Sequence, residues 1–208
     1  MIEFELKFKI STPPSALNKF QRIKQSSGQD LYYDTAEYDL IKAGNFLRLR
    51  DDKQVDFKLD LGDDEHLHCR ETNFNPDNFH PNDPDLLAIF DFLGIKINLD
   101  FTDFKSFIAV NKFKLLAPII KHRTTYRIDE TMDVMIDRVD DLGDFMEAEM
   151  MLKESETIDK TAIKKSIINK LEKLQIITDK YELINIGYVE LYLLKNNKPA
   201  YDLGKFKI

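Results

Sequence analysis

Cysteine is almost absent from this sequence of 208 residues, which contains Cys69 alone. A single cysteine excludes an internal disulfide and a zinc site built from several cysteines. Glycine and proline are also scarce, with seven of each, and no stretch has the composition of a flexible linker or a low-complexity tract. These absences predict a reduced, cytoplasmic protein.

Long apolar runs and a surplus of basic residues are missing as well. No uninterrupted apolar run approaches the roughly 20 residues that a membrane helix needs, and the charged start Met-Ile-Glu-Phe-Glu-Leu-Lys does not suit a signal peptide. The 30 Lys and Arg residues stand against 37 Asp and Glu residues, which gives a net charge of −7. General nucleic-acid binders usually carry a basic surplus. We therefore expect neither a membrane nor a nucleic acid as a partner.

The chain does contain a repeated alternation of apolar and charged residues. In the first ten residues, the apolar side chains of Ile2, Phe4, Leu6, Phe8 and Ile10 alternate with those of Glu3, Glu5, Lys7 and Lys9. A period of two is typical of a β-strand with one apolar and one charged face. The same period predicts further strands at residues 46–50, 55–59, 123–128, 134–139 and 145–151.

Apolar residues at helical spacing predict helices in four segments, at residues 15–25, 85–93, 159–174 and 188–194. Pro13 and Pro14 suit the start of the first segment, and Gly94 suits the C-terminal end of the second. The apolar stripe of the third predicts a helix packed on the outside of a sheet. Strands outnumber helices and follow one another in runs, so we predict an α+β fold with a mostly antiparallel sheet.

The charged faces of the predicted strands carry a selective set of residues. Members of each set lie two positions apart, about 6.5–7 Å along a strand, and the sets are Glu3, Glu5 and Lys7, then Arg48 and Arg50, then Glu147 and Glu149. Arginine and lysine bind phosphate oxygens, and clustered carboxylates repel one another unless a cation lies between them. Facing a shared interior, these residues would bind a polyanion and a hard cation such as Mg²⁺ or Mn²⁺. A solvated surface with weak ion pairs is the alternative, and the spacing leaves both open.

Several short segments occur in a characteristic order. They are Glu3-Phe4-Glu5-Leu6-Lys7, Tyr32-Tyr33-Asp34-Thr35, Leu40-Ile41-Lys42-Ala43-Gly44, Leu47-Arg48-Leu49-Arg50, Phe57-Lys58-Leu59, Lys121-His122-Arg123, Ile136-Asp137-Arg138-Val139 and Phe145-Met146-Glu147-Ala148-Glu149. Over nearly the whole chain, this ordered set resembles the CYTH superfamily of triphosphate tunnel metalloenzymes. The resemblance implies one domain over residues 1–208, an eight-stranded antiparallel tunnel that is closed or nearly closed, and helices packed outside it.

The resemblance also implies a set of site residues. Those expected to bind the phosphates of the substrate are Lys7, Arg48, Arg50, Lys58, Lys121 and Arg123. Those expected to hold Mg²⁺ or Mn²⁺ are Glu3, Glu5, Asp137, Glu147 and Glu149, with Glu5 and Glu149 as direct ligands. The catalytic set implied by the family is Glu3, Glu5, Lys7, Arg48, Arg50, Lys58 and Arg123.

The expected function is metal-dependent hydrolysis of a triphosphate-containing small molecule, which is inorganic triphosphate, a nucleoside triphosphate or thiamine triphosphate. The first alternative is a class IV adenylyl cyclase that converts ATP to cyclic AMP and pyrophosphate. The second alternative is a non-catalytic module that binds polyphosphate or a nucleotide. A protein that only binds anions would not need Glu3, Glu5, Glu147 and Glu149 together, so these four glutamates favour an enzyme. The sequence leaves open whether the protein forms a homodimer.

Three parts of the chain have no defined place in this prediction. The register of Arg70 and Glu71 is open, because either residue could lie on the charged face of a strand. Residues 95–120 are apolar and have no assigned role, and residues 195–208 are expected to form an added strand or a partner contact. Cys69 is expected to be a small buried residue, since no activating base lies near it in the sequence.

Overall fold

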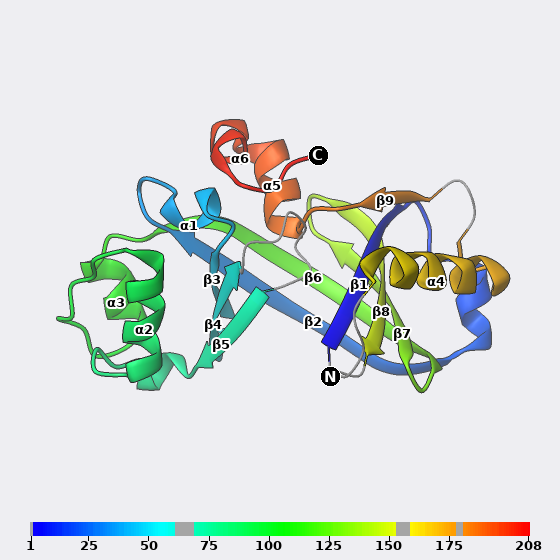
Figure 1. Cartoon of the computed structure of the whole chain (residues 1–208), viewed down its shortest axis with the longest axis horizontal. Helices are drawn as coiled ribbons and strands as arrows, with labels where there is room; N and C mark the ends of the chain where they lie inside the picture. Colours follow the sequence, from blue (N-terminus) through cyan, green and yellow to red (C-terminus); the bar gives the residue numbers. More distant parts are fainter. Residues whose placement is uncertain (1, 61–68, 153–158, 178–180) are drawn as a thin grey trace. The chain divides into compact units, whose positions relative to one another are not determined.

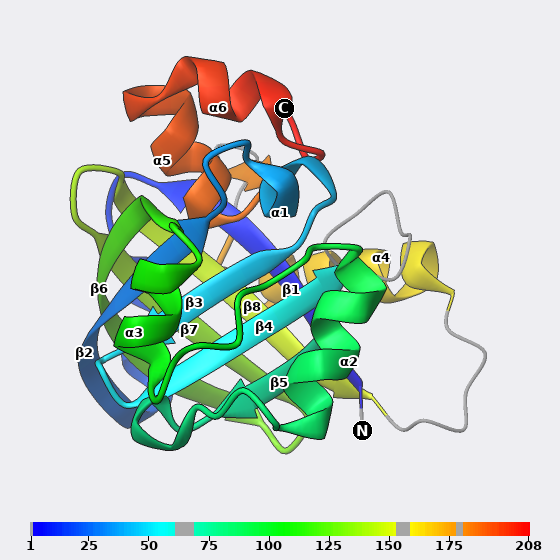
Figure 2. The ribbon, with the colours of Figure 1, turned by 90° about the vertical axis from the view of Figure 1, so that its left-hand side faces the viewer.

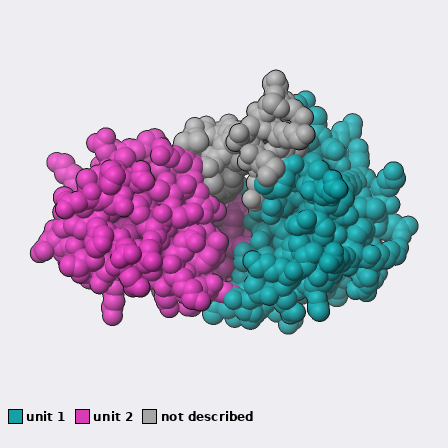
Figure 3. All heavy atoms as spheres, turned by 90° about the horizontal axis from the view of Figure 1, so that it is seen from below, with its two compact units in different colours: residues 1–27, 120–185 teal, residues 28–119, 186–208 magenta. Residues whose placement is uncertain are grey.

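The computed structural model describes residues 2–60, 69–152, 159–177 and 181–208, except for the side chains of Ile2, Glu3, Cys69, Leu152 and Lys160. The chain divides into two compact units, which Figure 3 colours separately. Unit 1 comprises residues 1–27 and 120–185, and unit 2 comprises residues 28–119 and 186–208. The single domain predicted over residues 1–208 stays a prediction.

Nine strands form one sheet in the order β5-β4-β3-β2-β6-β7-β8-β1-β9 (Figure 1). The strands are β1 (Ile2–Ile10), β2 (Gln21–Asp34), β3 (Phe46–Arg50), β4 (Gln54–Asp60), β5 (Cys69–Phe74), β6 (Lys114–Asp129), β7 (Met132–Val139), β8 (Gly143–Leu152) and β9 (Glu182–Ile184). The strand pairs within each unit are antiparallel. The α+β class is therefore confirmed, and among the described residues hydrogen bonds do not close the sheet.

The six strands predicted from alternation are all present, whereas the first predicted helix is wrong. A short 3₁₀ helix, η1 (Ser15–Lys19), replaces its first half, and β2 begins at Gln21. Ile23, expected to point inward, is 40% exposed. The segment Ser26-Ser27-Gly28 has poor helix formers, and the end of β2 pairs with β3. Backbone pairing with a distant strand therefore outweighs the weak helical spacing of this segment.

The other predicted helices are confirmed, each with local features that fix its ends. The helices of the structure are α1 (Asp39–Lys42), η2 (Pro76–Asn78), α2 (Pro84–Leu93), α3 (Phe104–Val110), α4 (Lys160–Lys173), α5 (Tyr188–Asn196) and α6 (Lys198–Leu203). Asp83 caps the N-terminus of α2, and Gly94 ends it with a left-handed φ of 65°. None of the helices in the described part of the chain is long and apolar enough to cross a membrane.

The apolar face of unit 1 follows from the alternation of β1. Phe4, Leu6 and Phe8 are buried, with 3–5% of their surface exposed. Helix α4, which Figure 1 shows lying across β1 and β8, buries Ile167 and Leu171 completely. The stripe predicted for this helix is therefore core, and the opposite face of the strands is left for the charged residues.

The core of unit 2 explains the apolar segment that had no assigned role. Helices α2 and α3 cover one face of strands β3, β4 and β5 (Figure 2). Residues 95–120 supply the core aromatics Phe101, Phe104, Phe107 and Phe113. Phe107 is fully buried, and five other phenylalanine rings lie with their centroids 5.1–6.1 Å from its own. This segment therefore builds the core beneath β3, the strand that carries Arg48 and Arg50.

The C-terminal residues of unit 2 form α5, α6 and a short tail rather than an added strand. The backbone N–H of Lys205 donates to the carbonyl of Ile41 at 3.0 Å. The ring of Phe206 lies against Gly44, whose φ is 74°. A Cβ atom added at Gly44 would lie 2.8 Å from that ring, closer than real contacts allow. Gly44 is therefore needed both for its left-handed backbone and for its lack of a side chain.

Replacing Gly44 with alanine should lower the free energy of unfolding by about 2–4 kcal/mol, because left-handed strain of about 1–2 kcal/mol adds to a steric clash. Gly94→Ala is the matched control, since Gly94 also has a positive φ but nothing lies within 4 Å of an added Cβ. Urea unfolding of both variants measures how much free energy of unfolding each one loses. Equal losses in the two variants would show that the contact with Phe206 contributes nothing.

Candidate functional site

In unit 1, the register between β1 and β8 places charged residues opposite one another. Glu5 lies opposite Glu149, and Lys7 lies opposite Glu147. Residues that are directly opposite in an antiparallel pair share a face of the sheet. Alternation along β1 sends Phe4 to the other face, so the apolar core and the charged face are separated by the pleat of the strand.

Lys7 joins two of these carboxylates. Its Nζ atom lies 3.5 Å from Oε1 of Glu5 and 3.3 Å from Oε1 of Glu147. The Lys7 and Glu147 side chains are mostly buried, with 11% and 4% of their surface exposed. Burial, followed by repulsion from Glu147, raises the pKa of Glu5 to about 7, although 35% of the Glu5 side chain is exposed. Two carboxylates therefore share a site that favours a bound proton or another cation.

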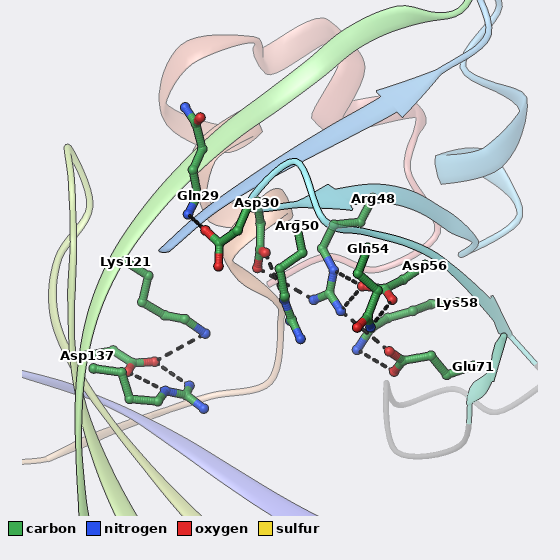
Figure 4. A network of polar contacts seen from close by, with 12 residues as sticks. Gln29, Asp30, Arg48, Arg50, Gln54, Asp56, Lys58, Glu71, Lys121 and Asp137 are labelled. Atoms are coloured by element: carbon green, nitrogen blue, oxygen red, sulfur yellow. Dashed lines mark hydrogen bonds and ion pairs between the residues drawn. The ribbon is translucent and has the colours of Figure 1, made fainter. Parts of the chain in front are cut away.

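A second cluster of unit 1 is centred on Asp137, which is fully buried on β7. Nε of Arg123 donates to Oδ1 of Asp137 at 2.7 Å, and Nη2 of Arg123 forms ion pairs with Asp137 and Glu147. Lys121 lies with its Nζ atom 3.8 Å from Asp137 (Figure 4). The structure thus places Asp137 as a partner of two cations, and its role as a metal ligand stays a prediction.

The acidic residues of unit 1 offer the oxygen donors that Mg²⁺ and Mn²⁺ prefer. Glu5 and Glu147 come together, and Glu149 lies across the strand pair from Glu5. The backbone of Glu3 lies opposite Met151, but its side chain is outside the described residues. Within the described chain, no group of three or more carboxylate, histidine or cysteine side chains is close enough to hold a metal ion. By residue type, these oxygen donors fit a divalent cation.

In unit 2, the register of three strands gathers a second charged face. Arg48 of β3 lies opposite Asp56 of β4, and Lys58 of β4 lies opposite Glu71 of β5. The open register of β5 is thereby defined. Arg70 lies opposite Leu59, on the face of β4 that carries the core residues, and Glu71 is on the charged face with Lys58.

Figure 4 shows three cations of this second face, Arg48, Arg50 and Lys58, and their side chains differ in solvent exposure. The Arg48 side chain is 5% exposed, and its Nε atom donates to Oδ2 of Asp56 at 2.7 Å. Arg50 is 41% exposed and pairs through Nε with Oδ1 of Asp30 at 3.0 Å. Lys58 is 32% exposed, and its Nζ atom lies 3.3 Å from Oε2 of Glu71. The face therefore has one buried arginine and two accessible cations.

Three acidic residues of unit 2 were not predicted as site residues. Asp56 could have been found, because it lies two positions before Lys58 in an alternating strand and shares its face. Asp30 belongs to β2, where a helix had been predicted nearby and no strand was recognised. Glu71 depends on the register of β5, which no local pattern defines.

The comparisons with known proteins identify the family of the chain. The model of the CYTH domain matches residues 1–181. This chain belongs to the CYTH domain family. The resemblance carried by the ordered segments is thereby confirmed, and the match ends before helices α5 and α6. No curated protein matches this CYTH chain.

Solved structures similar to this CYTH protein cover nearly its whole length. HpAC1 from Hippeastrum, a candidate adenylyl cyclase described as having a dominant triphosphatase activity, is 20% identical, with 96% of this chain and 98% of that chain covered and a TM-score of 0.62. The PH1819 protein from Pyrococcus horikoshii OT3 is 22% identical, with 93% and 99% covered and a TM-score of 0.57. A candidate adenylate cyclase from Vibrio parahaemolyticus is 16% identical, with 92% and 97% covered and a TM-score of 0.57. At these identities, the likeness shows a shared fold.

Proposed function

We propose that this CYTH protein hydrolyses a triphosphate-containing small molecule with the help of a bound divalent cation, Mg²⁺ or Mn²⁺. The main evidence for the proposal is that strand register separates apolar and charged side chains onto opposite faces of the strands. One face of each set of strands is core, and the other carries interleaved cations and carboxylates. A surface that only needed solubility would not bury Lys7, Arg48 and Glu147 to the extent observed. The triphosphatase activity described for the Hippeastrum protein supports the same proposal.

In this proposal, arginine and lysine side chains on the charged strand faces bind the phosphate oxygens of the substrate. Arg50 and Lys58 of unit 2 keep much of their surface exposed, so an incoming anion reaches them at low desolvation cost. Lys7, Lys121 and Arg123 of unit 1 are more enclosed and already lie in place among carboxylates. Charge fixed before the substrate arrives stabilises the charge that develops during phosphoryl transfer.

The carboxylates of unit 1 would hold the divalent cation. We assign this role to Glu5, Glu147 and Glu149, with Glu3 and Asp137 as further ligands. A metal ion bound there would neutralise charge on phosphate oxygens and activate water. Lys7 would then orient the two carboxylates that it contacts, Glu5 and Glu147.

Product analysis tests this function directly. The protein is incubated with tripolyphosphate, ATP or thiamine triphosphate in the presence of Mg²⁺ or Mn²⁺, and the products are identified by chromatography. Release of phosphate and the corresponding diphosphate is the expected result. Cyclic AMP as the main product from ATP would show that the protein is an adenylyl cyclase and not a hydrolase. Tight binding of tripolyphosphate without turnover would show that it is a non-catalytic binding module.

Replacing Glu5 with glutamine should reduce metal-dependent turnover by at least about 100-fold, because a neutral amide is a poor ligand for a hard cation. The measurement is the initial rate against the concentration of Mg²⁺ or Mn²⁺. Glu172→Gln, an exposed change on α4 of the same unit, is the control and should keep normal activity. Normal turnover by Glu5→Gln would rule out Glu5 as a ligand.

The same variant also has an expected signature in the pH dependence of stability. The pKa of Glu5 is raised from 4.5 to about 7 in the folded protein, so the folded state binds this proton more tightly than the unfolded state does. The stabilising contribution of Glu5 is therefore complete below pH 4.5 and is lost as the pH rises through 7. In metal-free buffer, the wild type should therefore lose stability relative to Glu5→Gln as the pH rises from 4.5 to 7.5. The difference in the free energy of unfolding, variant minus wild type, should increase by about 1–2 kcal/mol. This value is reduced because part of the Glu5 side chain is exposed to solvent. Urea unfolding at several pH values measures this difference, and a constant difference would contradict the raised pKa.

A further inference from the structure

Unit 2 contains a pocket of about 640 Å³ that the proposed triphosphate chemistry does not use. Its lining comes from three segments next to α1, α2 and α3 (Figure 2), at residues 35–42, 93–96 and 111–113. Small molecules bind in pockets of about 300–1,000 Å³, so the volume is sufficient for one. Helices α2 and α3 cover the core side of β3 and β4, whereas Arg50 and Lys58 belong to the charged side. The pocket is therefore a separate feature of unit 2.

Part of the lining is apolar. Phe113 belongs to the core of unit 2, and Leu93 and Ile95 pack against that core. Gly94 lies between the last two residues, and a Cβ atom added there would have nothing within 4 Å. A ligand in the pocket would therefore find open space beside Gly94, and its contact with the apolar side chains would remove hydrophobic surface from water.

The neutral polar side chains of the lining already have hydrogen-bond partners. The hydroxyl of Thr35 accepts from the backbone N–H of Asp39 at 3.0 Å and donates to Oδ2 of Asp39 at 2.8 Å. The side-chain amide of Asn111 accepts from the N–H of Asn98 at 2.6 Å and donates to the carbonyls of Asn98 and Phe107 at 3.1 Å. These contacts stabilise the walls of the pocket and leave little hydrogen-bonding capacity to select a neutral polar ligand.

Two lysines of the lining are in a different state. Lys42 is the last residue of α1 and Lys96 follows α2, and both are exposed. Among the described residues, neither ammonium group has a carboxylate within ion-pair distance. With Asp39, the described lining has two positive charges and one negative charge, a net charge of +1. Positive charge without an ion-pair partner, next to apolar side chains, favours an anion that also has an apolar part.

We propose that this pocket binds a small organic anion, a carboxylate or a phosphate ester with an apolar body. The ammonium groups of Lys42 and Lys96 bind the acidic group, and the side chains of Leu93, Ile95 and Phe113 contact the apolar body. This inference does not depend on the proposed triphosphate chemistry, because the residues that line the pocket differ from those of the candidate functional site.

Two fluorescent dyes of similar shape test the role of charge in this pocket. Anilinonaphthalene sulfonate (ANS) carries one sulfonate group, and phenylnaphthylamine is the same molecule without that group. The full chain is titrated with each dye in metal-free buffer, and the increase in fluorescence gives the dissociation constant. One ANS molecule per chain, with a dissociation constant of about 10–100 μM, is the expected result for a ligand of this size. Absence of ANS binding would overturn the proposal.

Lys42→Ala combined with Lys96→Ala should weaken ANS binding by about 10-fold and binding of the neutral dye by less than about 2-fold, because only ANS loses an electrostatic contact. Both lysines are exposed, so the fold should be retained. Lys24→Ala with Lys105→Ala is the control, which removes the same charge at exposed positions outside the lining and should leave both dissociation constants unchanged. Equal weakening for the two dyes, or no weakening for ANS, would overturn the proposal.

Arg50→Ala tests where ANS binds. Arg50 is an accessible cation of the charged strand face, so ANS bound on that face would lose affinity in this variant. The expected result is unchanged affinity, and a loss as large as that caused by the two lysine changes would overturn the assignment of the anion to the pocket. Octanoate and phenyl phosphate then compete with ANS in the wild type. Displacement by octanoate would identify a carboxylate site and displacement by phenyl phosphate a phosphate site, whereas displacement by neither would overturn the proposed class of ligand.

Discussion

Arg123→Ala should lower the free energy of unfolding by about 3 kcal/mol in metal-free buffer. The guanidinium of Arg123 pairs with Asp137, which is fully buried, and with Glu147, which is 3% exposed. Removal of the arginine leaves two buried carboxylates with less positive charge beside them, and breaking a buried pair in this way typically costs about 3–5 kcal/mol. Lys121 and Lys7 remain close to these carboxylates, so we place the loss at the lower end.

The same strand offers a matched control for this prediction. Arg127 of β6 also pairs with an aspartate, Asp133 of β7, but the two side chains are 48% and 23% exposed. Arg127→Ala should cost less than about 1 kcal/mol, because exposed ion pairs contribute little. Urea unfolding of both variants measures the contrast, and similar losses would show that burial does not determine the effect.

A rescue variant identifies the cause of the loss. Arg123→Met combined with Asp137→Leu removes the pair rather than one partner, and it should recover much of the stability that Arg123→Ala loses. Both variants should lack triphosphate turnover under the proposed function, since the phosphate-binding charge is gone in each. Recovery of stability without recovery of activity would separate folding from function in this cluster.

Phe107→Ala should lower the free energy of unfolding by about 3–5 kcal/mol, the usual range for a fully buried phenylalanine. Its ring lies among five others in the core of unit 2, so the cavity left behind is lined by rigid side chains that cannot easily fill it. The midpoint of urea denaturation reports the change. Phe92→Ala on α2, where the side chain is 59% exposed, is the control and should cost less than about 1 kcal/mol.

A small effect of Phe107→Ala would mean that residues 95–120 cover the strands without stabilising them. The expected large effect would connect this segment to the site, because the same core supports β3 and β4, the strands of Arg48 and Lys58.

The sequence predicted the strands well where one face is core and the other is charged. In β1, β4 and β8 the alternation of side chains is both the local signal and the cause of the final arrangement, because only one orientation buries the apolar set. The pairs Lys7–Glu147 and Lys58–Glu71 then follow from the register of neighbouring strands.

The elements that sequence analysis missed are those without such a signal. Strand β2 has little alternation at its start, where Gln21, Arg22 and Ile23 are all exposed, and it exists because a neighbour supplies its hydrogen bonds. Helix α3 is one of the shorter helices, at seven residues, and Asp103 caps it through a capping box with Ser106. The role of its aromatic residues is defined only by tertiary packing, which buries them in the core of unit 2.

The sequence by itself determined the family, the α+β class and the charged residues that alternate with the core, because these depend on residue type and spacing along the chain. Tertiary structure alone decided which carboxylate partners each cation. Asp56 pairs with Arg48, and Asp30 contacts both Arg48 and Arg50, because strand register brings these side chains together. Register is set by the whole sheet and its packing, so no local pattern contains it.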